Sequence, residues 1–135
     1  MDDSKRALKG SPSRDLFKQA HKNLSKQFYS CDIDFVWVGK YPPRIIAFLD
    51  FKLPRDRVTF SEVLAYNDLL RIAPVYIVES PDPTTGPFKV YSYSGGDFRP
   101  NPPDVELEHI ETCPDWLSFG KWERKVRSDG KGTTR

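Results

Sequence analysis

The sequence predicts an α/β fold, with a mixed central sheet flanked by helices, and three patterns indicate this class. Apolar residues recur at every fourth position between residues 16 and 28, as along one face of an amphipathic helix. Two runs rich in β-branched and aromatic residues, 33–38 and 44–51, flank a turn and predict a hairpin. A helix signal and a further such run at 75–78 follow. The order strand, helix, strand favours a parallel pair of strands joined by a right-handed crossover.

The first helix is expected to begin at Pro12, because proline loses nothing at the first helical position. Its apolar stripe consists of Leu16, Ala20, Leu24 and Phe28. A parallel row on another side of the helix consists of Lys18, Lys22 and Lys26. This row is either a solvated helix face or a surface that meets the phosphate backbone of nucleic acid.

The run at 44–51 is apolar on both faces until Asp50, which is typical of a strand inside a covered sheet. Thr59 and Glu62 have the spacing of a capping box, so a second helix is expected to start there and to end before Pro74. Glu62 therefore has two candidate roles, in the cap and in a site.

The rest of the chain predicts two strands, at 88–93 and 105–110, and a last helix at 115–127. This helix carries Trp116 and Trp122. We expect one of them to pack in the core, and a base-stacking or interface role is the alternative.

Length and composition limit the protein class. The 135 residues suffice for one domain, expected at 11–127 between a flexible leader at 1–10 and a flexible basic tail at 128–135. No apolar run approaches the roughly 18 to 20 residues of a membrane span, and the N-terminus lacks the apolar stretch of a signal peptide, which predicts a cytoplasmic protein. Cys31 and Cys113 have no zinc-ligand spacing, so both are expected to be reduced, with Cys31 in the core.

The net charge of +2 is unevenly distributed. Residues 1–30 carry seven basic and three acidic residues, and 120–135 carry six and two, so each end has a charge of +4. The segment 81–119 carries two basic and seven acidic residues, a charge of −5. Basic ends around an acidic middle suit an enzyme that contacts phosphates and holds a cation, and they equally suit two solvated tails.

Two aspartates interrupt the apolar strands, and an ionised carboxylate that is buried without a partner costs several kcal/mol or more. Asp50 and Lys52 share one face of a strand because strand side chains alternate. An antiparallel hairpin would place Asp34 beside Asp50. Two carboxylates and a backbone carbonyl, such as that of Phe51, suit Mg²⁺, and a nearby lysine can stabilise charge on a phosphate.

Asp34, followed sixteen residues later by Asp50-Phe51-Lys52, resembles the core signature of the PD-(D/E)XK nuclease superfamily. The resemblance covers roughly residues 14–80. It implies a restriction-endonuclease-like αβββαβ core, as in restriction enzymes and Holliday-junction resolvases. It further implies that Asp34 and Asp50 bind the metal and that Lys52 assists catalysis.

The sequence departs from the family pattern at several positions. Ile33 stands where the family has proline, and the first helix has no glutamate. Asp32 lies on the same strand face as Asp34 and is the alternative ligand. Glu62 holds the place where relatives have a polar residue in the second helix, with Tyr66 and Asn67 as the alternatives.

The resemblance implies a Mg²⁺-dependent DNA nuclease, in particular an endonuclease, that can use Mn²⁺ in place of Mg²⁺. No organic cofactor or membrane partner is expected, and a homodimer is expected because cutting both strands of a duplex needs two sites. The first alternative is a nucleic-acid-binding or accessory module on the same fold with a weakened site. The second is a protein-interaction domain that uses the acidic segment 97–115.

Overall fold

The computed structural model of the chain describes residues 12–22 and 31–132. The chain divides into two compact units, residues 1–30 and 31–135, and each is described by itself. In the first unit, helix α2 (Pro12–Lys22) begins at the predicted proline. Leu24, Phe28 and Lys26, like the leader at 1–10, lie outside the described residues, as does the side chain of Lys22.

The second unit contains a five-stranded sheet whose spatial order follows the chain. Its strands are β1 (Phe35–Lys40), β2 (Pro43–Lys52), β3 (Val75–Glu79), β4 (Phe88–Asp97) and β5 (Asp104–Cys113). Neighbouring strands are antiparallel except for β2 and β3, which are parallel. The predicted hairpin and the predicted parallel pair are therefore both confirmed, and the sheet is mixed.

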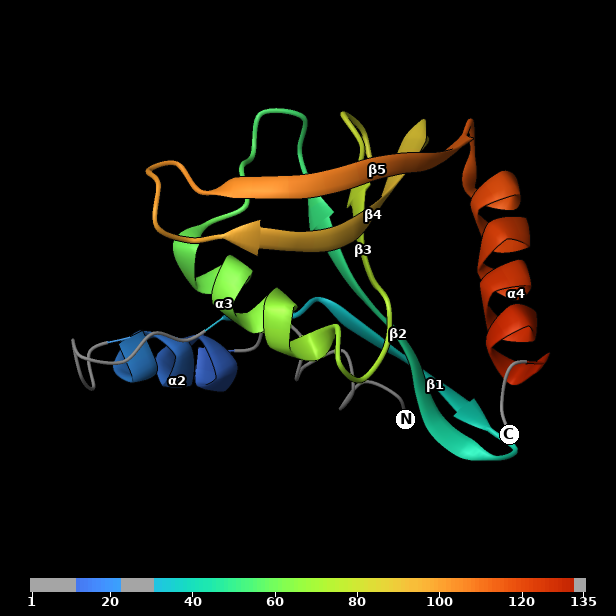
Figure 1. Cartoon of the computed structure of the whole chain (residues 1–135), viewed down its shortest axis with the longest axis horizontal. Helices are drawn as coiled ribbons and strands as arrows, with labels where there is room; N and C mark the ends of the chain where they lie inside the picture. The colour runs from blue at the N-terminus through green and yellow to red at the C-terminus, as the bar shows by residue number, and fades with distance from the viewer. Residues whose placement is uncertain (1–11, 23–30, 133–135) are drawn as a thin grey trace. The chain divides into compact units, whose positions relative to one another are not determined.

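Two helices cover opposite faces of this sheet, α3 (Phe60–Leu69) and α4 (Trp116–Gly132), as Figure 1 shows. Side chains alternate along each strand, so β2 contributes to two cores. Phe48 packs in the cluster that contains Val63 and Tyr66 of α3. Leu49 packs in the cluster that contains Trp122 of α4. Residues 46–50 of β2 are all buried, as predicted for a strand inside a covered sheet.

Helix α3 begins with the predicted capping box. The Thr59 hydroxyl accepts a hydrogen bond from the Glu62 backbone N–H at 3.3 Å, and the Glu62 carboxylate accepts one from the Thr59 backbone N–H at 2.9 Å. Two of the unpaired N–H groups at the helix start are thereby satisfied. The box fixes Glu62 in the first turn of α3, beside the end of β2.

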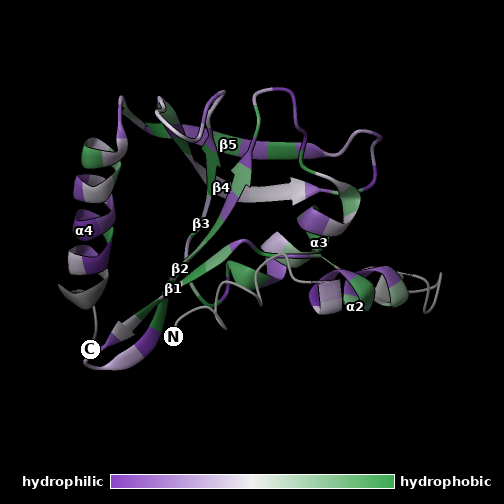
Figure 2. Cartoon of the chain, turned by 180° about the vertical axis from the view of Figure 1, so that it is seen from behind, coloured by the Kyte–Doolittle hydropathy of each residue, from purple (hydrophilic) through white to green (hydrophobic). Residues whose placement is uncertain are grey.

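The last elements are longer than predicted. Strands β4 and β5 each have ten residues, and α4 continues to Gly132, so residues 128–132 are helical and are not a flexible tail. Acidic residues in β5 gave a weak strand signal, but pairing with β4 supplies the hydrogen bonds that propensity alone does not predict. Figure 2 shows hydrophilic and hydrophobic residues interspersed along α4, as expected for a helix with one face on a sheet.

The α/β class with a mixed sheet is thus observed. In the described part of the chain, two strands stand between α2 and α3 where the αβββαβ order has three. None of the described helices has the length and apolar character required to cross a membrane.

Candidate functional site

Two hydrogen bonds, each from a backbone N–H to an aspartate side chain, link Asp34 to Asp50 and Phe51 at the end of the β1–β2 hairpin. Phe35 pairs with Leu49, so the register carried one residue further brings Asp34 opposite Asp50. The Asp34 backbone N–H donates to Oδ1 of Asp50 at 2.7 Å, and the Phe51 backbone N–H donates to Oδ2 of Asp34 at 2.8 Å. Asp34 thus contacts the end of β2 directly, and Asp32 is still the alternative ligand.

The carboxylate of Asp50 is buried, with 4% of the residue exposed. Its second oxygen, Oδ2, accepts a hydrogen bond from the phenol of Tyr66 in α3. Burial raises the pKa of Asp50, and the hydrogen bonds from Tyr66 and Asp34 oppose that rise. Burial also raises the pKa of Tyr66, so the phenol keeps its proton and remains a donor. Asp50 is therefore a desolvated acid held by two donors.

Lys52 forms an ion pair with Glu62 on the same face of the sheet as Asp50. The Lys52 Nζ lies 2.7 Å and 2.8 Å from the two carboxylate oxygens of Glu62. The two side chains are only 11% and 17% exposed, so this pair is screened less than a surface pair. Glu62 therefore serves the capping box and also contacts Lys52, and the two roles that the sequence left open are compatible.

Tyr66 and Asn67, the other two polar residues considered in α3, have different environments. The Tyr66 ring packs edge-on against Tyr93 with centroids 5.1 Å apart. The Asn67 side chain accepts hydrogen bonds from the Tyr93 hydroxyl at 2.7 Å and the Gly96 N–H at 3.2 Å. It also donates to the Gly96 carbonyl at 3.0 Å. Asn67 thus ties α3 to β4, whereas Tyr66 reaches the acid pair.

The sequence did not predict that Cys31 lies near Asp50 and Glu62. Cys31 was expected in the core, but it is only half-buried, and both cysteines are free thiols. Burial raises the pKa of the Cys31 thiol to about 11, and the negative charges of Glu62 and Asp50 add to the rise. The residue lies before β1, outside any periodic pattern, so the sequence held no signal for this placement.

The acids fit an open Mg²⁺ site better than a closed metal cage. Among the residues that the structure describes, no three His, Cys, Asp or Glu side chains form a group that could hold a metal. Mg²⁺, however, takes one or two carboxylates and keeps several waters. In a strand the N–H and C=O of one residue point to the same side, so the Phe51 carbonyl is directed toward Asp34, as its N–H is. Asp34, Asp50 and this carbonyl are hard oxygen donors of the kind Mg²⁺ prefers.

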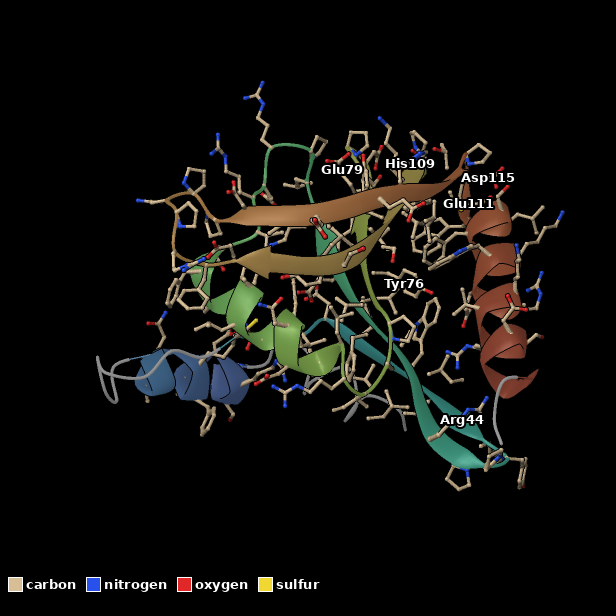
Figure 3. All side chains as sticks on the ribbon, in the orientation of Figure 1. Arg44, Tyr76, Glu79, His109, Glu111 and Asp115 are labelled. Carbon is tan, nitrogen blue, oxygen red and sulfur yellow. The ribbon has the colours of Figure 1, made fainter. Side chains whose placement is uncertain are left out.

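Other titratable residues lie apart from this group. His109 is exposed on β5, where its ring lies 5.4 Å from that of Tyr91 and its Nε2 lies 2.7 Å from the Thr112 hydroxyl. Figure 3 shows His109 and Glu111 on β5 and Asp115 at the start of α4. The neighbours of His109 are therefore residues of β4 and β5. Of the lysine row, Lys18 lies in α2, in the first unit, whereas Asp34 and Asp50 belong to the second.

Comparison with known proteins yields no relative: no family model, no curated protein and no solved structure matches this chain.

Proposed function

We propose that this protein is a divalent-metal-dependent nuclease of the PD-(D/E)XK kind that hydrolyses DNA phosphodiester bonds. The observation that carries the proposal is that the Asp50 carboxylate accepts a hydrogen bond from the Asp34 backbone and the Asp34 carboxylate accepts one from the Phe51 backbone, with Lys52 two residues beyond Asp50 on the same strand face. On this proposal, the β1–β2 hairpin, α3 and β3 correspond to the centre of a restriction-endonuclease-like αβββαβ core.

The metal-holding residues in this proposal are Asp34, Asp50 and the backbone carbonyl of Phe51. Bound there, Mg²⁺ or Mn²⁺ would polarise a phosphate oxygen and lower the pKa of a coordinated water. Asp34 is exposed, so a substrate can approach this side of the pair. Asp50 is fixed from the protein side by Tyr66 and by the Asp34 backbone, which prevents its carboxylate from turning away.

Lys52 is the group that stabilises negative charge on the phosphate. An ammonium has three N–H donors, and the two hydrogen bonds to Glu62 leave one for a phosphate oxygen. Glu62 is itself held by the capping box, so the lysine is positioned before the substrate binds. A donor that is fixed in advance stabilises a transition state without reorganisation, and losing one typically costs about 10²- to 10³-fold in rate.

The substrate in this proposal is DNA. The residues that the structure describes form one such site, so duplex cleavage implies a symmetric homodimer in which each protomer cuts one strand.

The test is incubation of the protein with plasmid and linear DNA in Mg²⁺, in Mn²⁺ and in EDTA. Cleavage is expected with either metal and not in EDTA. Asp50→Asn and Lys52→Met are each expected to lower the rate by at least about 10²-fold. The matched controls are Asp68→Asn, an acid of α3 that is 75% exposed, and Lys121→Met, an exposed lysine of α4. Both controls should cleave like the unmodified protein. Full activity in both site variants would exclude the assignment.

A second candidate is a nucleic-acid-binding or accessory module with a weakened site. It is favoured by the engagement of both Asp50 oxygens in hydrogen bonds, and by the finding that no three acidic, His or Cys side chains among the described residues form a metal-holding group. This candidate predicts salt-sensitive DNA binding without cleavage in any metal. A binding assay and the cleavage assay on the same DNA separate the two.

A further inference from the structure

A pocket of about 340 Å³ lies between the sheet and α4, and Asp50 is one of the residues that line it. Half of its lining residues are aromatic: Phe35, Trp37 and Phe51 from the hairpin, Phe88 from β4, and Trp116 and Phe119 from α4. The volume is within the range of small-molecule sites, roughly 300 to 1,000 Å³.

The pocket adjoins the candidate site at three residues, of which Asp50 is itself one of the acids. Phe51 lines the pocket, and its backbone N–H is the donor to Asp34. Phe35, which also lines the pocket, directly follows Asp34 in the chain. A phosphate bound at Asp34 would therefore lie next to residues that line the pocket.

The lining has the chemistry that recognises a flat heterocycle. Phe35 and Trp116 are each 54% exposed, so ring surface is available on two sides of the opening. The Trp116 indole N–H donates to the carbonyls of Pro83 at 3.0 Å and Thr84 at 3.1 Å, which fixes the orientation of the ring. The one acidic side chain in the α4 wall, Glu123, is held by Arg127 at 2.8 Å. Its second oxygen is available to accept an N–H of a base.

Gly120 keeps the α4 wall open. Glycine in a helix interior costs about 0.5 to 1 kcal/mol relative to alanine, so its presence calls for a reason. No close neighbour forbids a side chain, because an added Cβ would meet only the Arg124 guanidinium, at 3.7 Å. Position 120 lies one turn after Trp116 and one turn before Glu123, on the stripe that lines the pocket. Any side chain at this position would therefore occupy space beside Trp116.

We infer that this pocket binds an unstacked nucleobase of single-stranded DNA, adjacent to the phosphate held at the acid pair. The inference rests on the proposed function and specifies its substrate: DNA in which a base near the scissile phosphate is unpaired. Stacking on aromatic side chains tolerates all bases, because every base has a flat π-face.

The test compares two single strands of equal length in EDTA, one with normal bases and one with abasic sugars throughout. Phosphate contacts are the same in both, so a difference in Kd reports the bases. The unmodified protein should bind the normal strand on the order of tenfold more tightly than the abasic one, as one stacked base gives. Gly120→Leu should abolish the difference in Kd between the normal and the abasic strand. It should not lower the Tm, because replacing a glycine inside a helix favours the helix. Phe35→Ala should reduce the difference, and Leu117→Ala, a variant of an α4 residue that is 69% exposed, should leave it unchanged.

Equal binding of the two strands by the unmodified protein, with metal-dependent cleavage intact, would overturn the pocket assignment and leave the nuclease proposal standing. Base-dependent binding that is lost in Gly120→Leu, without cleavage in any metal, would support the pocket and overturn the nuclease. Base-dependent binding that persists in both Gly120→Leu and Phe35→Ala would place the base elsewhere and overturn the inference.

Discussion

The Asp50 carboxylate accepts hydrogen bonds from both sides, from the Asp34 backbone N–H on Oδ1 and from the Tyr66 phenol on Oδ2. One donor comes from the strand hairpin and the other from α3 across the crossover. The acid is thus positioned by two elements that meet only in the folded chain. A substitution that alters either donor should therefore change the environment of the Asp50 carboxylate although Asp50 itself is retained.

Tyr66→Phe is expected to destabilise the protein by about 1 to 3 kcal/mol, because it leaves a buried acceptor without one of its donors. The ring contact with Tyr93 is retained, so packing changes little. Urea unfolding measures the free energy of unfolding. Tyr41→Phe is the control, since Tyr41 is 75% exposed, and it should change stability by less than about 0.5 kcal/mol. Equal stability of the two variants would show that the Tyr66 hydroxyl does not stabilise the fold.

The raised pKa of Asp50 predicts the sign of a pH effect in the metal-free protein. Burial raises the folded-state pKa above the unfolded value, so between the two values the native state binds more protons than the unfolded state. The free energy of unfolding then falls as pH rises through this window. Asparagine does not titrate. We therefore compare the free energy of unfolding of the unmodified protein with that of Asp50→Asn. The value for the unmodified protein minus the value for the variant should decrease as pH rises from the ordinary aspartate range toward neutral.

Asp97 provides a control of opposite sign for this experiment. Hydrogen bonds from Arg99 lower the pKa of Asp97 to about 2, so its contribution to stability is present above the ordinary aspartate pKa and is lost as pH falls through about 2. The free energy of unfolding of the unmodified protein minus that of Asp97→Asn should increase with pH over the acid range. If the Asp50 and Asp97 differences change in the same direction, the folded pKa of Asp50 is not raised.

Glu62→Gln separates the two roles of Glu62. Glutamine is also a capping-box residue, so the cap is kept, while the charge that holds Lys52 is lost. We expect a loss of about 1 to 3 kcal/mol in stability from the weakened charged hydrogen bonds, together with a lower cleavage rate.

Thr59→Ala is the matched variant for Glu62. It removes the hydroxyl side of the cap, costs about 1 kcal/mol, and leaves the ion pair of Lys52 in place. Its cleavage rate should equal that of the unmodified protein. A rate lowered equally in Thr59→Ala and Glu62→Gln would mean that α3 stability, and not the ion pair, controls cleavage.

The sequence predicts local features of this fold better than long-range ones. The capping box at Thr59 and the start of α2 at Pro12 depend on neighbours within one helical turn, and both were predicted. A strand was predicted at 105–110, but the full length of β5 depends on pairing with β4, and its acidic residues weakened the strand signal. The α4 extension to Gly132 was missed because basic and polar residues suggested a tail.

In the candidate site, too, local relationships were predicted better than long-range ones. The alternation of β2 placed Asp50 and Lys52 on one face, and the hairpin placed Asp34 beside Asp50. The Tyr66 contact with Asp50 crosses from α3 to β2, and the sequence offered it only as one of three alternatives. The residues that line the aromatic pocket come from five helices and strands and from one loop. No spacing of residues in the sequence predicts that they lie together.

Cys31 offers a chemical probe of charge at the site. With its pKa raised to about 11 from 9.0, its thiolate fraction at neutral pH is roughly a hundredfold below that of an ordinary thiol, and alkylation by iodoacetamide should be correspondingly slow. The negative charge of Glu62 raises this pKa, and the positive charge of Lys52 lowers it. Glu62→Gln should therefore speed alkylation, whereas Lys52→Met should slow it. Peptide mass mapping in EDTA separates Cys31 from the buried Cys113. A general loosening of the fold would speed the reaction in both variants, so opposite changes identify the charges of this ion pair as the cause.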